Sequence, residues 1–453
     1  MSATALRASV DDVEFMARTD ILALQRAKLV ALGRRLQAEV SWRAHFATAG
    51  VSPADLAAQD GLAASPMLEK ADLRAFYPFP FLTIAPEQVA RFVATSGTTG
   101  LPVLFGLSHA DIEWLLPWQL GRIFRAAGLR PGERVYQGYG YGMWIGGVAM
   151  DIGLKAYGAV NIGMGPGRGE LAVAWLRDHA ITACTMSPLW LMTLAGLARS
   201  HGIDPRRDWR LRLGIFGGQS VSAAFRAELE AAMPDGFLAH NVYGTTEAGG
   251  PVVSVSCPHS HADDEMHLIN EDTILTEILD PATMRPVGPG EVGEIVVTTL
   301  DKQASPVVRW RTRDLVRLSA HPFECPCGRV GMPRIGRIIG RSDDMLKVRG
   351  VMVFPSQVED VLGGIPGLAR EAWQIVLDSV PGGLDGMTVQ VERLEQCPHP
   401  VEDLPAVVEA ALNARFGLRC AVTAHAPGSL PRHESKAVRV MRREHGASEQ
   451  PRP

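Results

Sequence analysis

The sequence predicts an α/β protein in two parts: a large N-terminal domain of layered sheets and helices, followed by a smaller α+β C-terminal domain. Between residues 90 and 320, short β-rich runs alternate with Ala/Leu-rich helical stretches, which is typical of α/β layers. At residues 334–345 the pattern changes to a basic, Gly-punctuated segment that ends in the paired acids Asp343 and Asp344. Strands and helices then alternate anew, so we expect domains at 1–341 and 342–441.

Each part of the chain has its own periodicity. Residues 1–75 place Leu29, Leu32 and Leu36 at helical spacing, which predicts a packing layer of helices. In the larger domain, strands are predicted at 91–94, 134–136, 214–216 and 294–297, and helices at 171–178 and 221–232. In the smaller domain, strands are predicted at 352–354, 374–376 and 388–391, and helices at 357–362 and 404–416. Residues 442–453, rich in Arg, Glu, Gln and Pro, are predicted to form a disordered tail.

Composition and charge argue against several classes of function. The 453 residues include 45 Lys and Arg against 49 Asp and Glu, for a net charge of −4, whereas nucleic-acid binding needs a basic surface. No apolar stretch reaches the ~20 residues of a membrane-spanning helix, and the acidic N-terminus does not resemble a signal peptide. We therefore expect a cytoplasmic protein that binds neither nucleic acid nor membranes. Lysine is rare and occurs only at positions 28, 70, 155, 302, 347 and 436, so each lysine is a candidate for a specific role.

A Ser/Thr/Gly-rich segment follows the predicted strand at 91–94. It reads Thr-Ser-Gly-Thr-Thr-Gly at 95–100, and its two glycines allow successive N–H groups to converge on an anion while the hydroxyls add further donors. It is not a Walker A loop, because no Lys lies near position 100. The segment is either a phosphate cradle or an ordinary Ser/Gly-rich hairpin.

Two further segments combine groups that a nucleotide needs. Residues 241–250 contain an aromatic ring, a glycine, two hydroxyls and the carboxylate of Glu247, which together could stack on a base and hold hydrated Mg²⁺. The alternative is a turn with a solvated Glu. In residues 308–317, Asp314 lies among four arginines, where an isolated carboxylate is expected to pair or to bind a diol.

Half of the six cysteines lie in short motifs with metal-ligand chemistry. Cys257 and His261 form a Cys-x₃-His pair, and Cys325 and Cys327 form a Cys-x-Cys pair, a composition that suits a tetrahedral structural Zn²⁺. His259, His267 and His321 compete for the histidine position. The alternative is buried free thiols with solvent-facing histidines.

Five segments, in this order, resemble the adenylate-forming superfamily of acyl-CoA synthetases, carrier-protein adenylation domains and luciferases. They are the segments at 94–102, 241–250, 308–317, 340–350 and 430–440. Within the superfamily the chain looks most like the phenylacetate-CoA ligase branch, on the cues Tyr-Gly-Tyr-Gly at 139–142, Met-His-Leu-Ile-Asn-Glu-Asp at 266–272 and Val-Phe-Pro-Ser-Gln-Val-Glu at 353–359. The resemblance covers about residues 70 to 440 and implies a smaller domain that moves about a hinge.

The resemblance implies a role for each motif residue. The residues implied for nucleotide binding are Thr95, Ser96, Gly97, Thr98, Thr99 and Gly100 at the β- and γ-phosphates, Tyr243, Gly244, Thr245 and Thr246 at the adenine and phosphates, Asp314 at the ribose hydroxyls, and Arg341 at ribose or phosphate. Glu247 would be the Mg²⁺ partner, and Lys436 would lie between the substrate carboxylate and the α-phosphate. Asp343 would form the hinge, and Lys347 would line the approach of the thiol.

The resemblance also places an aromatic acyl pocket. The residues implied to line it are Tyr136, Tyr139, Trp144, Gly214, Phe216 and Gly217. Gly-Gly-Gln-Ser at 217–220 replaces the Gly-Ala-Glu-Pro usual for phenylacetate enzymes, so an amino- or hydroxybenzoate is as plausible a substrate as phenylacetate.

We therefore expect an ATP-dependent aryl acid-CoA ligase that uses ATP, Mg²⁺ and CoA, releases AMP and pyrophosphate, and has a structural Zn²⁺. A close alternative passes the aryl group to a carrier-protein thiol or an amine, and a remote one is a non-catalytic nucleotide-binding module. The resemblance adds the expectation of a homodimer.

Overall fold

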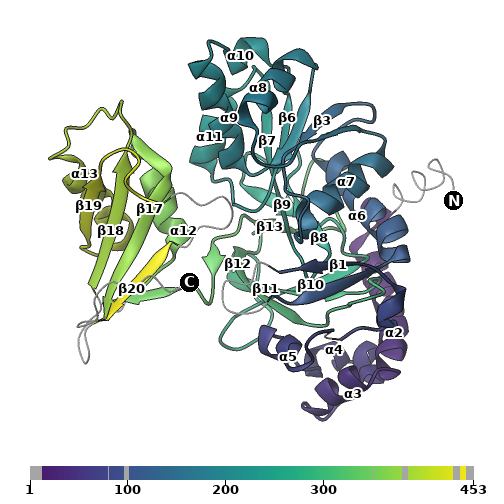
Figure 1. The fold of residues 1–453 in the computed structure, drawn as a ribbon. Helices are drawn as coiled ribbons and strands as arrows, with labels where there is room; N and C mark the ends of the chain where they lie inside the picture. The colour runs from purple at the N-terminus through teal and green to yellow at the C-terminus, as the bar shows by residue number, and fades with distance from the viewer. Residues whose placement is uncertain are drawn as a thin grey trace. The chain divides into compact units, whose positions relative to one another are not determined.

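The chain folds into two compact units, residues 1–337 and 338–453, as seen in a computed structural model (Figure 1). The structure describes residues 13–79, 81–95, 102–349, 351–379, 386–431 and 439–444. Both units combine helices with sheets, so the predicted α/β class is confirmed. The predicted domain boundary at 341/342 stays a prediction.

An eight-stranded sheet forms the centre of the larger unit, in the order β13-β9-β8-β7-β6-β5-β3-β4. Its strands are β3 (Arg134–Gln137), β4 (Val160–Gly163), β5 (Ala183–Met186), β6 (Leu213–Phe216), β7 (Leu238–Thr245), β8 (Gly250–Val255), β9 (Glu265–His267) and β13 (Arg334–Gly336). The strands from β4 to β7 run parallel, whereas β8, β9 and β13 continue the sheet in antiparallel pairs. The predicted strands at 134–136 and 214–216 therefore belong to one sheet, as β3 and β6.

Helices cover both faces of the parallel strands (Figure 1). They are α6 (Leu116–Ala126), α7 (Ile145–Tyr157), α8 (Gly169–Asp178), α9 (Pro188–Ser200), α10 (Pro205–Asp208) and α11 (Ala223–Ala232). The hydroxyls of Ser187 and Ser222 cap α9 and α11 by accepting from the backbone N–H groups of Trp190 and Phe225, which satisfies one of the unpaired amides at each helix start. α8, α9 and α11 pack on β3, β5 and β6 in one hydrophobic core.

A second sheet in the larger unit is antiparallel and contains β10 (Ile274–Leu279), β11 (Val292–Thr299) and β12 (Trp310–Arg317). A hairpin of β1 (Val89–Ala94) and β2 (Leu104–Ser108) precedes the single-turn π-helix at 111–115. The N-terminal layer has α2 (Arg18–Gln37), α3 (Val40–Ala47), α4 (Gly61–Ala64) and α5 (Lys70–Ala75), with 3₁₀ turns at 53–57 and 86–88. The predicted helical layer is present, and Leu32 and Leu36 of α2 are buried.

The smaller unit has a mixed sheet in the order β19-β18-β17-β20. Its elements are β14 (Gly340–Arg341), β15 (Leu346–Val348), β16 (Val351–Val353), α12 (Pro355–Gly363), β17 (Leu368–Ser379), β18 (Gly386–Arg393), α13 (Leu404–Phe416), β19 (Ala421–His425) and β20 (Val440–Glu444). α12 and α13 pack on the sheet through buried aliphatic residues. β20 pairs in parallel with β17, so the tail predicted from residue 442 is wrong for 442–444, whose backbone completes a sheet. Residues 445–453 lie outside the described residues.

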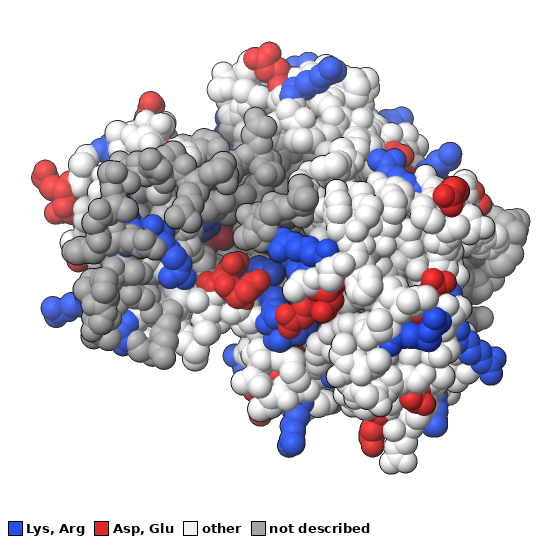
Figure 2. Space-filling view, turned by 60° about the horizontal axis from the view of Figure 1, so that its bottom comes forward, with Lys and Arg blue, Asp and Glu red and all other residues white. Residues whose placement is uncertain are grey.

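The surface charge is mixed. On the face drawn in Figure 2, basic and acidic side chains are interspersed, as expected from the near balance of charges in the sequence. Among the described residues, no helix combines the length and the apolarity that crossing a membrane requires.

Candidate functional site

Tyr243 and Asp314, from two different sheets, meet through a hydrogen bond. The Tyr243 hydroxyl on β7 donates to Oδ2 of Asp314 on β12, over 2.6 Å. Burial and the neighbouring Asp314 carboxylate both raise the pKa of Tyr243 well above its usual value, so the phenol stays protonated and acts as the donor. Two motifs that were predicted to bind one nucleotide therefore lie in direct contact.

An irregularity in β12 positions Asp314. The pairing of β11 with β12 shifts between Glu294 and Val296, and Arg313 adopts a positive φ of 66°. The Thr312 hydroxyl accepts from the Asp314 backbone N–H and donates to the Ile295 carbonyl. The arginines around Asp314 pair with other carboxylates, namely Arg309 with Glu277, Arg311 with Glu294 and Glu69, and Arg313 with Glu69. The excess of basic charge noted in the sequence is therefore largely neutralised by glutamates from other segments.

The turn between β7 and β8 holds Glu247. A Cβ on Gly244 would come within 1.8 Å of the Gly250 carbonyl oxygen, so only glycine allows this close approach of the two strands. The Thr245 hydroxyl accepts from the Ala248 backbone N–H, and Gly250 has a φ of 121°. Glu247 is 8% exposed, and its carbonyl oxygen accepts a hydrogen bond from Nζ of Lys302 over 2.9 Å.

Thr95 closes the neck of the predicted phosphate loop. Its backbone N–H donates to the Val103 carbonyl, and its hydroxyl accepts from the Val103 N–H. The hairpin of β1 and β2 is thus continued by one more pair. Ser96, Gly97, Thr98, Thr99 and Gly100 lie outside the described residues, as does Lys436.

The aromatic residues predicted for the acyl pocket separate into three groups. Tyr136 and Phe216 are completely buried in the core beneath α8 and α9. Tyr139 links strand ends, because its hydroxyl donates to the Met186 carbonyl and accepts from the Gly217 N–H. Trp144, at the N-cap of α7, is 40% exposed.

Close packing explains two glycines of this region. A Cβ on Gly214 would come within 2.3 Å of the Phe216 ring, and one on Gly217 would lie 3.2 Å from the Tyr139 hydroxyl. The loop that carries Trp144 also contacts the phosphate-loop hairpin, because the Met143 carbonyl accepts from the Ala94 N–H over 2.9 Å. The predicted acyl and phosphate segments are therefore neighbours.

The smaller unit contains the remaining predicted residues. Arg341 and Asp343 form a bidentate ion pair with two nitrogen–oxygen distances of 2.9 and 3.0 Å. Lys347 is on β15, and its side chain lies outside the described parts of the structure.

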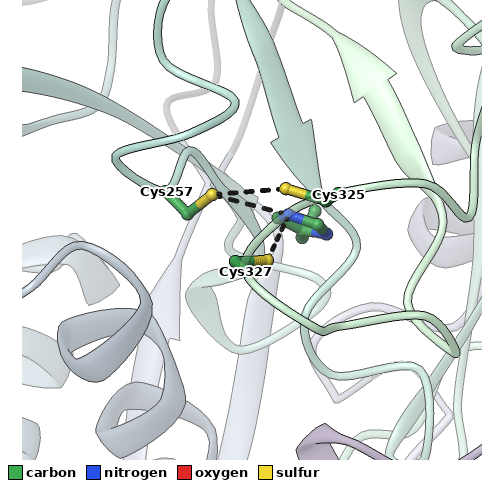
Figure 3. Close-up of side chains that lie close together, drawn as sticks. Cys257, Cys325 and Cys327 are labelled. Atoms are coloured by element: carbon green, nitrogen blue, oxygen red, sulfur yellow. Dashed lines mark hydrogen bonds between the residues drawn. The ribbon is translucent and has the colours of Figure 1, made fainter.

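Three thiols and one imidazole converge behind β8. Cys257 follows β8, His267 ends β9, and Cys325 and Cys327 lie in the connection from β12 to β13. Cys257 Sγ lies 3.7 Å from both Cys325 Sγ and His267 Nε2, and Cys327 Sγ lies 3.3 Å from His267 Nε2. All four donor atoms fall within 4.8 Å of one another, and Figure 3 shows the three labelled thiols pointing inward.

The predicted histidine ligand, His261, is not among these clustered donors. Its Nε2 lies 2.6 Å from Glu230 on α11, and the pairing of Val255 with His267 brings His267 to the thiols instead. Nδ1 of His267 faces the Met332 carbonyl at 3.3 Å, which directs Nε2 to the sulfurs. The hydrogen bond with Cys327 holds the pKa of Cys257 below the usual thiol value.

Comparisons with known proteins agree with this geometry. The model of the AMP-binding enzyme family matches residues 21–300, and that of the AMP-binding enzyme C-terminal domain matches residues 350–443. The chain belongs to the AMP-binding enzyme family. Tyr243 and the Glu247 turn thus lie within the segment matched by the larger model, and Asp314 lies after its end at residue 300.

Relatives that match nearly the whole chain indicate the branch of the family to which it belongs. A phenylacetate-coenzyme A ligase of Pseudomonas putida is 38% identical over 408 residues and covers 88% of each chain. One from Escherichia coli is 35% identical over 440 residues, covering 95% of this chain and 97% of that one. A 2-hydroxyisobutyryl-CoA ligase solved with 2-HIB-AMP superposes with a TM-score of 0.83 at 26% identity, over 92% of this chain and 89% of that one. The predicted phenylacetate-CoA ligase branch is confirmed.

Two residues of this AMP-binding enzyme escaped the sequence analysis. His267 was named only as a competitor, because its role depends on the register of β8 and β9. Lys302 was marked only by the rarity of lysine, yet it is 1% exposed and contacts the Glu247 turn. Burial lowers the pKa of Lys302 to about 8, against the opposing effect of Asp111 and Glu247.

Proposed function

We propose that this protein adenylates an aryl carboxylic acid with ATP and then transfers the acyl group to CoA, releasing AMP and pyrophosphate. The observation that carries the proposal is the Tyr243–Asp314 hydrogen bond, which joins two nucleotide motifs of a chain related to phenylacetate-CoA ligases over nearly its full length. The chain is accordingly an AMP-forming CoA ligase.

Adenylation requires a weakly nucleophilic carboxylate to attack the α-phosphorus of ATP. Negative charge grows on the phosphoryl oxygens in the transition state, so fixed positive charge and donors aimed at them lower the barrier. We assign Lys436 and the segment 95–100 to this task. Asp314 offers its carboxylate to the ribose hydroxyls. The Tyr243 phenol holds this carboxylate, and the Thr312 hydroxyl holds the Asp314 backbone by accepting from its N–H.

Glu247 fits a Mg²⁺ site by its chemistry, because Mg²⁺ prefers one or two carboxylates together with phosphate oxygens. Lys302 and the glycine-dependent turn hold the Glu247 backbone in place, which fixes the position from which its side chain extends. When bound, Mg²⁺ would neutralise charge on the phosphates.

The second half-reaction is attack of the CoA thiol on the acyl-adenylate. In this proposal Asp343 acts as the hinge of the smaller domain, and Lys347 lines the approach of the thiol. Arg341, paired with Asp343, would contact ribose or phosphate in one of the two states.

The acid is proposed to be aromatic. Tyr139 is locked between the Met186 carbonyl and the Gly217 N–H, so its ring is a rigid wall, and the partly exposed Trp144 offers a second apolar surface. Tyr136 and Phe216 would support this wall from the core. Because Gln219 stands where phenylacetate enzymes usually have Glu, amino- and hydroxybenzoates belong in the test beside phenylacetate.

A pyrophosphate-exchange screen tests the proposal. The acids are benzoate, amino- and hydroxybenzoates, phenylacetate and cinnamate, with a fatty acid as the control, each with and without CoA. Exchange with one aryl acid, and a CoA-dependent release of AMP, are expected. Pyrophosphate exchange without any increase in AMP release when CoA is added would indicate a carrier-protein thiol or an amine as acceptor. No exchange with any acid would leave a non-catalytic nucleotide-binding module.

The thiol cluster is proposed to bind a structural Zn²⁺. A tetrahedral zinc with Zn–S of about 2.3 Å and Zn–N of about 2.0 Å requires roughly 3.8 Å between two sulfurs and roughly 3.5 Å between sulfur and nitrogen. The observed separations are 3.7 Å between the sulfurs of Cys257 and Cys325, and 3.3 and 3.7 Å from His267 Nε2 to Cys327 and Cys257. Donor set and spacing thus fit zinc.

Metal analysis of two histidine variants tests the zinc site. His267→Ala is expected to lose bound zinc, whereas His261→Ala, the matched control, is expected to keep it. Equal zinc content in both variants would contradict the ligand set.

A homodimer and a cytoplasmic location complete the proposal. Size-exclusion chromatography with light scattering tests the homodimer.

A further inference from the structure

Lys302 is a fully buried cation at the meeting point of three chain segments. It lies in the connection from β11 to β12 and is 1% exposed. Its Nζ donates to the Glu247 carbonyl over 2.9 Å and lies 5.1 Å from the centre of the Phe105 ring on β2. Glu247 belongs to the predicted Mg²⁺ and nucleotide turn, β2 forms one arm of the phosphate-loop hairpin, and the connection itself leads to Asp314.

The backbone around Lys302 is tied to the same hairpin. The Gly106 N–H on β2 donates to the Ser305 hydroxyl over 2.8 Å. The N–H groups of Gln303 and Ala304 donate to the buried carboxylate of Asp111, which also accepts from the Ser108 N–H at the end of β2. The connection is therefore held in a fixed position relative to β2. Because the Lys302 ammonium donates to the Glu247 carbonyl, it also fixes the Glu247 turn relative to β2.

A packing role alone does not explain a lysine here. Removing an ammonium from water is costly, and an apolar side chain of similar length such as Met would fill the same space without that cost. The nearby Lys28 behaves differently, because it is partly exposed and pairs with Asp301 at the start of the same connection. Two lysines thus hold one segment, but only Lys302 touches a nucleotide motif.

We propose that Lys302 is a positioning residue for the adenylation site: its ammonium fixes the Glu247 turn against the phosphate-loop hairpin and thereby sets where the Glu247 carboxylate meets the metal–nucleotide complex. The inference rests on the proposed function. It concerns adenylation only, because attack of CoA on a finished acyl-adenylate makes no use of a Mg²⁺-bound triphosphate.

The test compares three variants of the full chain with the wild type. Lys302→Met removes both the donor and the charge, and Lys302→Gln keeps an N–H donor without the charge. Lys28→Met, on α2, is the matched control, because Lys28 pairs with Asp301 of the same connection. Two rates are measured: pyrophosphate exchange as a function of Mg²⁺ at fixed ATP and acid, and thioester formation from supplied acyl-adenylate and CoA. Thermal unfolding of each variant reports whether it folds.

In Lys302→Met, the Mg²⁺ concentration for half-maximal exchange is expected to rise about tenfold or more, as for the loss of a hydrogen bond to a charged group. Thioester formation from the supplied adenylate is expected to stay near the wild-type rate. The Mg²⁺ requirement of Lys302→Gln is expected to lie between those of the wild type and Lys302→Met. Lys28→Met is expected to match the wild type in both rates.

Three outcomes would overturn the inference. The first is an unchanged Mg²⁺ dependence in Lys302→Met. The second is a parallel fall of both rates, which general loosening of the fold would produce. If Lys302→Met does not fold, an unchanged Mg²⁺ dependence in Lys302→Gln is the third. In each of these cases exchange by the wild type still supports the proposed function, whereas absence of exchange by the wild type with every acid overturns the function and the inference together.

Discussion

The proposed nucleotide site and the thiol cluster both border strand β8 (Gly250–Val255), yet they are assembled in different ways. Ser254 of β8 pairs with Tyr243, and the adjacent Val255 pairs with His267. The cluster draws Cys257 from just after β8 and His267 from the neighbouring β9, so the backbone ladder between these strands positions half of its donors. Tyr243 instead reaches Asp314 on another sheet, 71 residues later, through a side-chain contact.

This difference separates the consequences of damage. A loss in the thiol cluster would remove the proposed zinc cross-link between β8, β9 and the β12–β13 connection, so it is expected to act on stability. A loss in the proposed nucleotide site would remove proposed contacts with the substrate and is expected to act on activity, because the surrounding strands keep their ladders. The following experiments test that separation.

Lys436→Ala is expected to have the largest effect. Pyrophosphate exchange should fall by about 10²–10³, as for the loss of one preorganised charge at a developing oxyanion. Thioester formation from supplied acyl-adenylate should change much less, and the melting temperature should not move. Lys155→Ala, at an exposed position of α7, is the control. An equal fall of both half-reactions would show that Lys436 does not act in adenylation.

Cys327→Ser is expected to act on stability alone. Bound zinc should be lost, and the melting temperature should fall by roughly 3–4 °C, which corresponds to about 2–3 kcal/mol for a unit of this size. The ATP concentration for half-maximal exchange should remain within about twofold of the wild type at a temperature where the variant is folded, because no nucleotide contact is lost.

The matched control for the cluster is Cys397→Ser in the smaller unit, which should keep both zinc and melting temperature. A Cys327→Ser chain that melts normally but needs far more ATP would reverse the comparison. It would mean that β8 transmits the state of the cluster to Tyr243.

Tyr243→Phe is expected to have the smallest effect and to be confined to nucleotide binding. Removing one hydrogen bond to the Asp314 carboxylate should raise the ATP concentration for half-maximal exchange about three- to tenfold, with little change in maximal rate. Steady-state exchange at varied ATP measures this. A lowered maximal rate at unchanged ATP dependence would place the phenol in the chemical step instead.

The sequence predicted what local motifs encode. The α/β class and the strand before residue 95 follow from short-range patterns, whereas the contact between Asp314 and Tyr243 joins residues 71 apart in the chain. His267 required the register between two antiparallel strands, which no local spacing reveals, and the Cys-x₃-His spacing pointed to His261 instead. Tyr136 and Phe216 are on parallel strands buried on both faces, where residues of the core and of a binding site have the same apolar pattern.

Lys302 was beyond prediction for a different reason. Its partners, Phe105, Glu247 and Asp111, come from three segments that meet only in the folded chain. A lone lysine in a connection between strands is ordinarily a solvent-exposed residue. Only its rarity in this arginine-rich chain set it apart.

The connection from β11 to β12 is irregular in shape but bonded like a strand. Its amides at Gln303, Ala304, Val307 and Arg309 all donate to buried side-chain oxygens. Slow amide hydrogen exchange is therefore expected over this segment, governed by opening of the whole unit, not by local fraying. A surface connection would exchange its amide protons quickly, whereas this one should retain deuterium as long as the core strands that it joins.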